Sequence, residues 1–457
     1  MREKRNKKKR ERCASLHSVG LVSLGCAKNL VDSEKILGNL ATAGFAICAD
    51  DADADIIIIN TCSFVQPARE ESLRCIKEFC RRKKEGKLQN IIVTGCLAQQ
   101  EGADLFKKVK GVDAAVSFKY YPDIASILER LLIGEKRITA VGLPEKFDAE
   151  VSRLLLTFPH YAYLRVAEGC DNTCTFCTIP SIKGKYRSKP LAEIMKEANE
   201  LTGAGVKELI LIAQDTAAYG KDFQEADSTD IATVLKNLCS IDSLKWIRLL
   251  YANPESISDK LIEVIASQKK VVKYIDIPIQ HINDSVLRRM GRKSRCNNIE
   301  KLISKLRSSI PDIFIRTTVI TGFPGETENE FHELLEFIKT VRFERLGAFA
   351  YSPEKGTPSS KMNLLPDKLC RKRREEVMRT QQEIVFELNR SLIGKKIESI
   401  IDFRSEGEYP FVGRTEFDAP EIDSSIYIKG QNAVAGKIVS ATITGYRGYD
   451  LTGEIED

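Results

Sequence analysis

The chain has 457 residues, 43% of them hydrophobic, and a formal net charge of +6, which fits a globular protein of roughly two to four domains. No apolar run approaches the ~20 residues that span a bilayer, and the charged N-terminus lacks the apolar segment of a secretory signal. Thirteen cysteines, an odd number, argue against a disulfide framework. We therefore expect a protein of the reducing cytoplasm with no membrane partner.

A basic tail, residues 1–15, begins the chain. Its first twelve residues, MREKRNKKKRER, carry eight basic and two acidic side chains, a local charge of +6 that equals the charge of the whole chain. Such a run predicts a disordered tail that contacts RNA or is only solvated. The remaining residues are close to neutral, so the overall charge says little about the folded part.

Three apolar runs in residues 16–150, LVSLGC, IIIINTC and IIVTGC, end in Cys26, Cys62 and Cys96, which we call the scattered triple. Such runs are typical of buried parallel strands, and helical stretches such as SEKILGNLATAG separate them. Ligands collect at the carboxyl ends of parallel strands. We therefore predict a parallel-sheet domain in which the three cysteines converge. The alternative is three ordinary buried cysteines.

Six further apolar runs, most of them separated by amphipathic helical segments, occupy residues 151–387. This repetition predicts an α/β domain that forms a partial (β/α)6 barrel, with its functional residues at the C-terminal ends of the strands. The candidates at these ends are Gln214, Asp215, His281 and the glycine turn Gly322–Gly325. A packed structural role is the better interpretation of His281, and a tight connection also explains the glycine turn.

The first of the six runs leads into EGCDNTCTFCTIP, whose Cys170, Cys174 and Cys177 we call the compact triple. Soft thiolates on one loop select iron–sulfur clusters, zinc or copper. Structural zinc needs a fourth ligand, and the closest histidine, His160, is ten residues upstream of Cys170. A thiolate triple instead holds three irons of a cubane and leaves the fourth open. The two triples together predict two 4Fe–4S clusters.

The last domain, residues 388–457, follows a long charged helix that begins after Pro366. The short runs ESIIDFR, FVGRTEF, SSIYIKG and KIVSATITGY predict a small antiparallel β-barrel. Eight basic and twelve acidic residues give this domain a net charge of −4. An acidic barrel favours a basic partner over phosphate. The acids expected to contact that partner are Glu416, Asp418, Glu421 and Asp423.

From about residue 19 onward, the chain resembles the methylthiotransferase family of radical S-adenosylmethionine (SAM) enzymes. The stretches that carry the resemblance are SLGCAKNLVDSE, NTCSFV, TGCLAQ, CDNTCTFCTIP, DIPIQHINDSVLRRMGR, TGFPGETE and YSPEKGTP. The resemblance implies an N-terminal cluster domain, a radical SAM barrel and a C-terminal TRAM domain. It also implies that the compact triple binds the SAM cluster and that the scattered triple binds an auxiliary cluster.

Two branches of this family compete. The RimO type modifies an aspartate of small-subunit ribosomal protein S-twelve, and the MiaB type modifies a tRNA adenosine. Ala27, Lys28 and Asn29 favour the RimO type, because the tRNA branch typically has glutamine-methionine-asparagine there. The acidic last domain also suits a basic ribosomal protein. The resemblance therefore implies methylthiolation of an aspartate β-carbon. The alternatives are a tRNA methylthiotransferase and a non-catalytic iron–sulfur redox or regulatory protein.

The implied reaction begins when an electron from the SAM cluster cleaves SAM to a 5′-deoxyadenosyl radical, which removes hydrogen from the aspartate β-carbon. Sulfur held at the auxiliary cluster is methylated by another SAM and joins the carbon radical. An external electron donor and a sulfur source are required. Phe176 is expected either to pack against adenine or to belong to the core, and Gln214 and Asp215 are the other candidates for binding SAM. No catalytic residue beyond the cluster ligands follows from the sequence.

Overall fold

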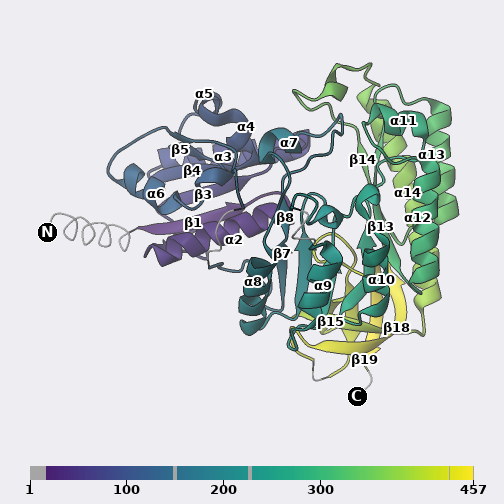
Figure 1. The fold of residues 1–457 in the computed structure, drawn as a ribbon. Coiled ribbons are helices and arrows are strands. Elements are labelled where there is room, and N and C mark those ends of the chain that lie inside the picture. The colour runs from purple at the N-terminus through teal and green to yellow at the C-terminus, as the bar shows by residue number, and fades with distance from the viewer. Residues whose placement is uncertain (1–16, 148–151, 225–228, 432, 456–457) are drawn as a thin grey trace. The chain divides into compact units, whose positions relative to one another are not determined.

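The computed structural model describes residues 17–147, 152–224, 229–431 and 433–455, so the predicted basic tail lies outside the described residues. The chain forms two compact units (Figure 1). The first contains the chain up to Leu156 together with Glu168–Asp171 and Thr178–Arg187, and the second contains the rest. In the described part, no helix combines the length and the apolar character needed to cross a membrane. The boundaries predicted near residues 150 and 388 stay predictions.

The first unit contains a six-stranded sheet in which all neighbouring strands are parallel. In spatial order the strands are β2 (Ala46–Ile47), β1 (Ser18–Ser23), β3 (Ile56–Thr61), β4 (Asn90–Gly95), β5 (Ala114–Val116) and β6 (Ile138–Ala140). The order reverses direction between β1 and β3. In open α/β sheets, such a reversal opens a crevice at the carboxyl ends of the two strands, where ligands bind.

Helices cover both faces of this sheet, which explains why its central strand is apolar at successive positions. Ile56 and Ile58 of β3 pack with residues of α2 (Ala27–Thr42) and α6 (Ile124–Leu132). Ile57 and Ile59 pack on the other face. That face is covered by α3 (Gln66–Lys84), α4 (Cys96–Glu101) and α5 (Leu105–Lys108). The predicted parallel-sheet domain is confirmed.

The second unit contains six parallel strands that form an open barrel. In chain order they are β7 (Tyr161–Arg165), β10 (Glu208–Ile212), β11 (Trp246–Leu249), β12 (Val271–Asp276), β13 (Phe314–Thr321) and β14 (Arg345–Ala350). The helices of this barrel are α8 (Leu191–Gly203), α9 (Ile231–Cys239), α10 (Asp259–Ser267), α11 (Asp284–Arg289), α12 (Cys296–Ser309) and α13 (Glu328–Val341). The predicted partial (β/α)6 barrel is confirmed. Two short strands, β8 (Ala167–Glu168) and β9 (Arg187–Ser188), pair separately, and α7 (Ile179–Lys183) lies between them in the chain.

The chain ends in a small closed barrel that follows α14 (Asp367–Leu392), the long helix predicted after Pro366. Its strands are β15 (Lys396–Arg404), β16 (Phe411–Thr415), β17 (Ile426–Lys429), β18 (Ile438–Arg447) and β19 (Asp450–Ile455). The barrel differs from the predicted one in two ways. β19 was not among the four predicted strands, and it pairs in parallel with β17, whereas the other neighbours are antiparallel.

Acids of this last barrel form buried ion pairs with the larger barrel, which corrects an expectation from the sequence. Asp418 lies 2.5 Å from an Nη of Arg345, and its side chain is only 1% exposed. Asp423 accepts a hydrogen bond from the hydroxyl of Tyr274 at 2.7 Å and lies 3.3 Å from the Nε of Arg316. The expectation that Asp418 and Asp423 contact an external basic partner is therefore wrong. Their charge balances arginines of the strands that they cover.

A second buried network joins the two barrels around Glu208. Its carboxylate pairs with Arg248 and with Arg414, each at 2.8 Å, and Arg414 also pairs with Asp402 at 2.9 Å. The negative charge counted in the last domain therefore serves in part to hold that domain in place. Deleting residues 388–457 would remove Asp418 from the buried Arg345 and Arg414 from the buried Glu208, and the loss of one partner of a buried ion pair is strongly destabilising.

Candidate cluster sites

The scattered triple lies at the carboxyl ends of three adjacent strands, as predicted. Cys26 follows β1 and directly precedes α2, Cys62 directly follows β3, and Cys96 is the first residue of α4 after β4. Cys26 and Cys62 therefore flank the point where the strand order reverses. The three cysteines therefore lie at one edge of the sheet despite their separation in sequence, and this is the edge at which open α/β sheets generally bind ligands.

Two glycines let the loops after β1 and β4 press against the end of β3. A Cβ on Gly25 would lie 2.6 Å from the Cβ of Cys62 and 3.2 Å from its Sγ. A Cβ on Gly95 would lie 2.4 Å from the carbonyl oxygen of Thr61. Both glycines have positive φ, +94° and +87°, which other residues adopt only with strain. These close approaches bring the residues next to Cys26 and Cys96 onto the end of β3.

Buried polar side chains hold the same edge in place. The Nδ2 of Asn29 donates to the carbonyl oxygens of Leu24 and Thr61, each at 3.0 Å. Asn60 donates to the carbonyl of Asn29 at 2.8 Å. The hydroxyl of Ser72 accepts from the backbone N–H of Cys62 and donates to its carbonyl. The loops are therefore positioned by their own hydrogen bonds before any ligand binds.

Burial sets the protonation of two of these thiols. Cys62 and Cys96 are 8% and 6% exposed, whereas Cys26 is exposed. Burial raises the pKa of Cys62 and of Cys96, which disfavours their thiolate forms. Among the described residues, no three acidic, histidine or cysteine side chains converge on a single ion. A cubane does not require this, because each thiolate binds a different iron.

The compact triple lies on the loop after β8, and the division into units separates its members. Cys170 lies in the first unit, where its backbone N–H donates to the carbonyl of Gly184 at 3.2 Å. Cys174 and Cys177 lie in the second unit, where the N–H of Cys177 donates to the carbonyl of Cys174 at 3.1 Å. Thr175, between them, bonds through its N–H to Met290. Each part of the loop is therefore held by the body to which it belongs.

Arg292 is a functional candidate that the sequence did not single out. Its side chain is buried, one Nη lies 3.8 Å from the Sγ of Cys174, and the other donates to Asn253 at 2.8 Å and to the carbonyl of Pro278 at 3.2 Å. The structure thus places a fixed positive charge next to the sulfur of Cys174. Arg292 ends the quoted stretch DIPIQHINDSVLRRMGR, but no spacing links it to a cysteine more than a hundred residues away.

The three residues predicted to bind SAM have different surroundings. Phe176 packs edge-on against Phe323, with ring centroids 6.3 Å apart, next to a buried apolar cluster. The carboxylate of Asp215 accepts from the N–H of Asn253 at 3.2 Å and from the hydroxyl of Ser256 at 2.7 Å. Asp215 therefore braces the loop after β11. The Oε1 of Gln214 is buried and accepts no hydrogen bond from the described residues, so it is the one of the three with an unused acceptor.

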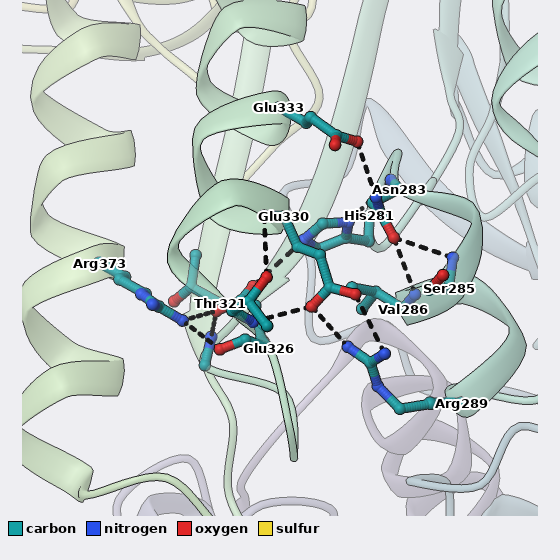
Figure 2. A network of polar contacts seen from close by, with 12 residues as sticks. His281, Asn283, Ser285, Val286, Arg289, Thr321, Glu326, Glu330, Glu333 and Arg373 are labelled. Atoms are coloured by element: carbon teal, nitrogen blue, oxygen red, sulfur yellow. Dashed lines mark hydrogen bonds and ion pairs between the residues drawn. The ribbon is translucent and has the colours of Figure 1, made fainter.

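Figure 2 shows the network that contains His281, at the carboxyl ends of β12 and β13. The fully buried ring accepts the N–H of Asn283 on Nδ1 at 3.0 Å, so the neutral ring carries its proton on Nε2, 3.1 Å from Glu326. Glu326 also accepts from the N–H of Gly322 at 2.6 Å and from Arg373 at 2.7 Å. The structural interpretation of His281 is confirmed, because the ring helps to fix the glycine turn.

Three family profiles match the chain in succession. Residues 18–117 match "Uncharacterized protein family UPF0004", residues 164–338 match the "Radical SAM superfamily", and residues 393–455 match the "TRAM domain". Relatives named "Ribosomal protein uS12 methylthiotransferase RimO" match over nearly the whole length. One from Thermoanaerobacter sp. (strain X514) is 46% identical, covering 96% of this chain and 100% of its own. One from Geotalea uraniireducens (strain Rf4) is 45% identical, covering 96% and 98%.

The chain belongs to the RimO family. It is a radical SAM methylthiotransferase, and the cofactors of the family are SAM and 4Fe–4S clusters. Membership decides between the two branches that the motifs left open, in favour of the RimO type. Among solved structures, the radical SAM methyltransferase TsrM from Kitasatospora setae has a TM-score of 0.55 at 13% identity, covering 83% of this chain and 76% of its own. The cobalamin-dependent radical enzyme OxsB has a TM-score of 0.52 at 15% identity, covering 79% and 56%. These structures share the fold.

Proposed function

We propose that this RimO family member installs a methylthio group on the β-carbon of an aspartate of ribosomal protein uS12 (S-twelve). In the proposal, the compact triple holds the cluster that binds SAM, and the scattered triple holds an auxiliary cluster. The carrying observation is the position of Cys26, Cys62 and Cys96 at three adjacent strand ends beside the reversal of strand order. Relatives that are 43–46% identical and bear the uS12 methylthiotransferase name support the choice of substrate.

The donor sets fit the proposed cofactors. Each triple supplies three thiolates, the number that leaves one iron of a cubane open for another ligand. When bound, the clusters supply the electron that cleaves SAM and a site for the sulfur that is transferred.

The residues of the chain position these groups and shield them from water. Gly25 and Gly95 allow the loops to meet at Cys62, and the burial of Cys62 and Cys96 keeps water from that side of the site. Arg292 holds a positive charge beside Cys174. Gln214 offers an unused buried acceptor at the end of β10, where an amino group of SAM would find a partner.

The ligand assignment is tested by iron content. Anaerobically reconstituted protein should hold about eight irons, and the Cys26→Ala, Cys62→Ala, Cys96→Ala protein should hold about four and still cleave SAM. A matched control replaces three cysteines outside both triples, Cys48, Cys239 and Cys296, by alanine and should keep about eight. Loss of all iron from the first variant, or only about four irons in the parent, would overturn the assignment.

The substrate is tested by mass spectrometry of uS12 and of tRNA from cells that lack this protein. The methylthio group should disappear from the uS12 aspartate, and tRNA adenosines should keep theirs. The opposite pattern would restore the tRNA alternative. SAM cleavage under strong reductant separates both from a non-catalytic iron–sulfur regulator, which would release no 5′-deoxyadenosine.

Further partners belong to the same proposal. An external electron donor and a sulfur source are needed, and the basic tail, residues 1–15, is proposed to contact RNA. The reducing cytoplasm is the proposed compartment, because clusters and unpaired thiols persist there. Removing the tail should weaken RNA binding at low salt and leave SAM cleavage unchanged, since all six proposed ligands lie downstream.

A further inference from the structure

The first unit buries an ion cluster close to the scattered triple. Lys183, the last residue of α7, is 2% exposed. Its Nζ lies 2.6 Å from a carboxylate oxygen of Glu168 and 3.2 Å from one of Asp32. Arg187 lies 3.9 Å from the other oxygen of Glu168, so this group contains two cations and two acids. Burying four charges is costly, and the electrostatic field that they create is strong because water does not screen it.

Lys183 ends a helix that packs against the helix that Cys96 begins. Ile182 of the same helix shares an apolar core with Cys96. The Nζ also lies 3.2 Å from the centre of the Phe118 ring, which belongs to the same core. Burial raises the pKa of Cys96, and the Lys183 charge is the main influence that opposes this rise. Lys183 therefore places a buried positive charge against the apolar core that contains Cys96.

A buried cation at this edge would offset part of the negative charge of a bound cluster. Three thiolates give a cubane net negative charge, and each added electron or sulfur anion increases it. Net charge and solvent exposure are two of the factors that set the reduction potential of iron–sulfur clusters. Two of the three thiols are buried, so water cannot offset this charge on their side.

We propose that Lys183 is the charge-compensating residue of the auxiliary cluster, held beside Cys96 by Asp32 and Glu168, and that it raises the reduction potential of that cluster. The inference rests on the proposed assignment of the scattered triple as ligands. Lys183 acts here as a positioning residue for charge, since it touches neither substrate nor SAM in the proposal.

The test uses the full-length chain with Cys170, Cys174 and Cys177 replaced by alanine, so that only the auxiliary cluster contributes to the electron paramagnetic resonance signal. In a redox titration, Lys183→Met should lower the equilibrium constant for reduction about tenfold, a midpoint shift of about 59 mV for one electron. Lys183→Arg keeps the charge and should stay near the parent. Asp32→Asn removes a negative charge that acts on Cys96 and should shift the midpoint upward.

A matched control is Lys83→Met. Lys83 pairs with Asp113, which precedes β5 and therefore lies at the amino edge of the same sheet, away from the cysteines. The redox midpoint of the Lys83→Met protein should equal that of the parent. The proposal is overturned if Lys183→Met keeps about four irons with an unchanged midpoint, or if Lys183→Arg shifts as far as Lys183→Met.

Opposite shifts from Lys183→Met and Asp32→Asn cannot come from a general loss of folding. If Lys183→Met holds no iron, Lys183→Gln, which keeps a polar group for Asp32 and Glu168, is measured in its place, and an unchanged midpoint refutes the proposal. If the background protein itself holds no iron, the ligand assignment fails first and the inference falls with it. Iron content therefore separates the two failures.

Discussion

Gly95→Ala is the perturbation that most directly tests how the scattered triple is assembled. The new Cβ would lie 2.4 Å from the Thr61 carbonyl oxygen, and real contacts of this kind are essentially never under 3.0 Å, so the loop carrying Cys96 must move away from β3. Alanine at a φ of +87° and a ψ of −157°, a region that is essentially restricted to glycine, costs about 1–3 kcal/mol. The forced displacement of a packed loop adds about 1–3 kcal/mol. We expect about four irons instead of about eight, with SAM cleavage retained.

Gly44→Ala is the matched control for this prediction. Gly44 has a φ of +88°, nearly the same as Gly95, but a Cβ there meets no atom within 4 Å. It should therefore show only the conformational cost, about 1–2 kcal/mol, and keep about eight irons. Iron analysis and the thermal unfolding midpoint of both variants, measured side by side, provide the comparison. If Gly95→Ala kept its iron and unfolded like Gly44→Ala, close packing at Thr61 would not be what assembles the site.

Two further predictions concern the second unit. Arg292→Met should remove the fixed charge beside Cys174 and reduce SAM cleavage about tenfold or more, while the auxiliary cluster stays bound. Arg292→Lys should recover part of the activity. Equal SAM cleavage by the parent and by Arg292→Met would refute this role. Burial would raise the pKa of Glu208, but Arg414 and Arg248 outweigh it and hold the pKa below 4.5. The ion pairs of Glu208 therefore stabilise the folded protein fully when the pH is above the pKa that Glu208 has in the unfolded chain. This stabilisation is lost as the pH falls through the lower pKa that Glu208 has in the folded protein. Thermal unfolding should show a steep loss of stability below pH 4.5 that is weaker in Arg414→Met, and equal acid sensitivity of both proteins would contradict the assignment.

The sequence alone determined those features that depend on short stretches. CxxxCxxC identifies the compact triple because its three thiols share one loop. The strands that end at Cys62 and Cys96 could be predicted because both faces of a parallel sheet are covered, so the run stays apolar. Helix α14 could be predicted from its charged residues and its start after Pro366, and the six barrel units from the repetition of apolar runs and helical segments.

Only the tertiary structure decided which distant residues meet. β19 was missed because DLTGEI has few apolar residues and contains a glycine. The segment forms a strand because its backbone pairs with that of β17. Asp418 was expected from the sequence to contact an external basic partner, and only the structure showed that it pairs with Arg345 of the larger barrel. Lys183 follows the compact triple in the chain but folds into the first unit. Such contacts cannot be inferred from positions along the chain, because packing and ion pairing depend on which residues lie close together in the folded protein.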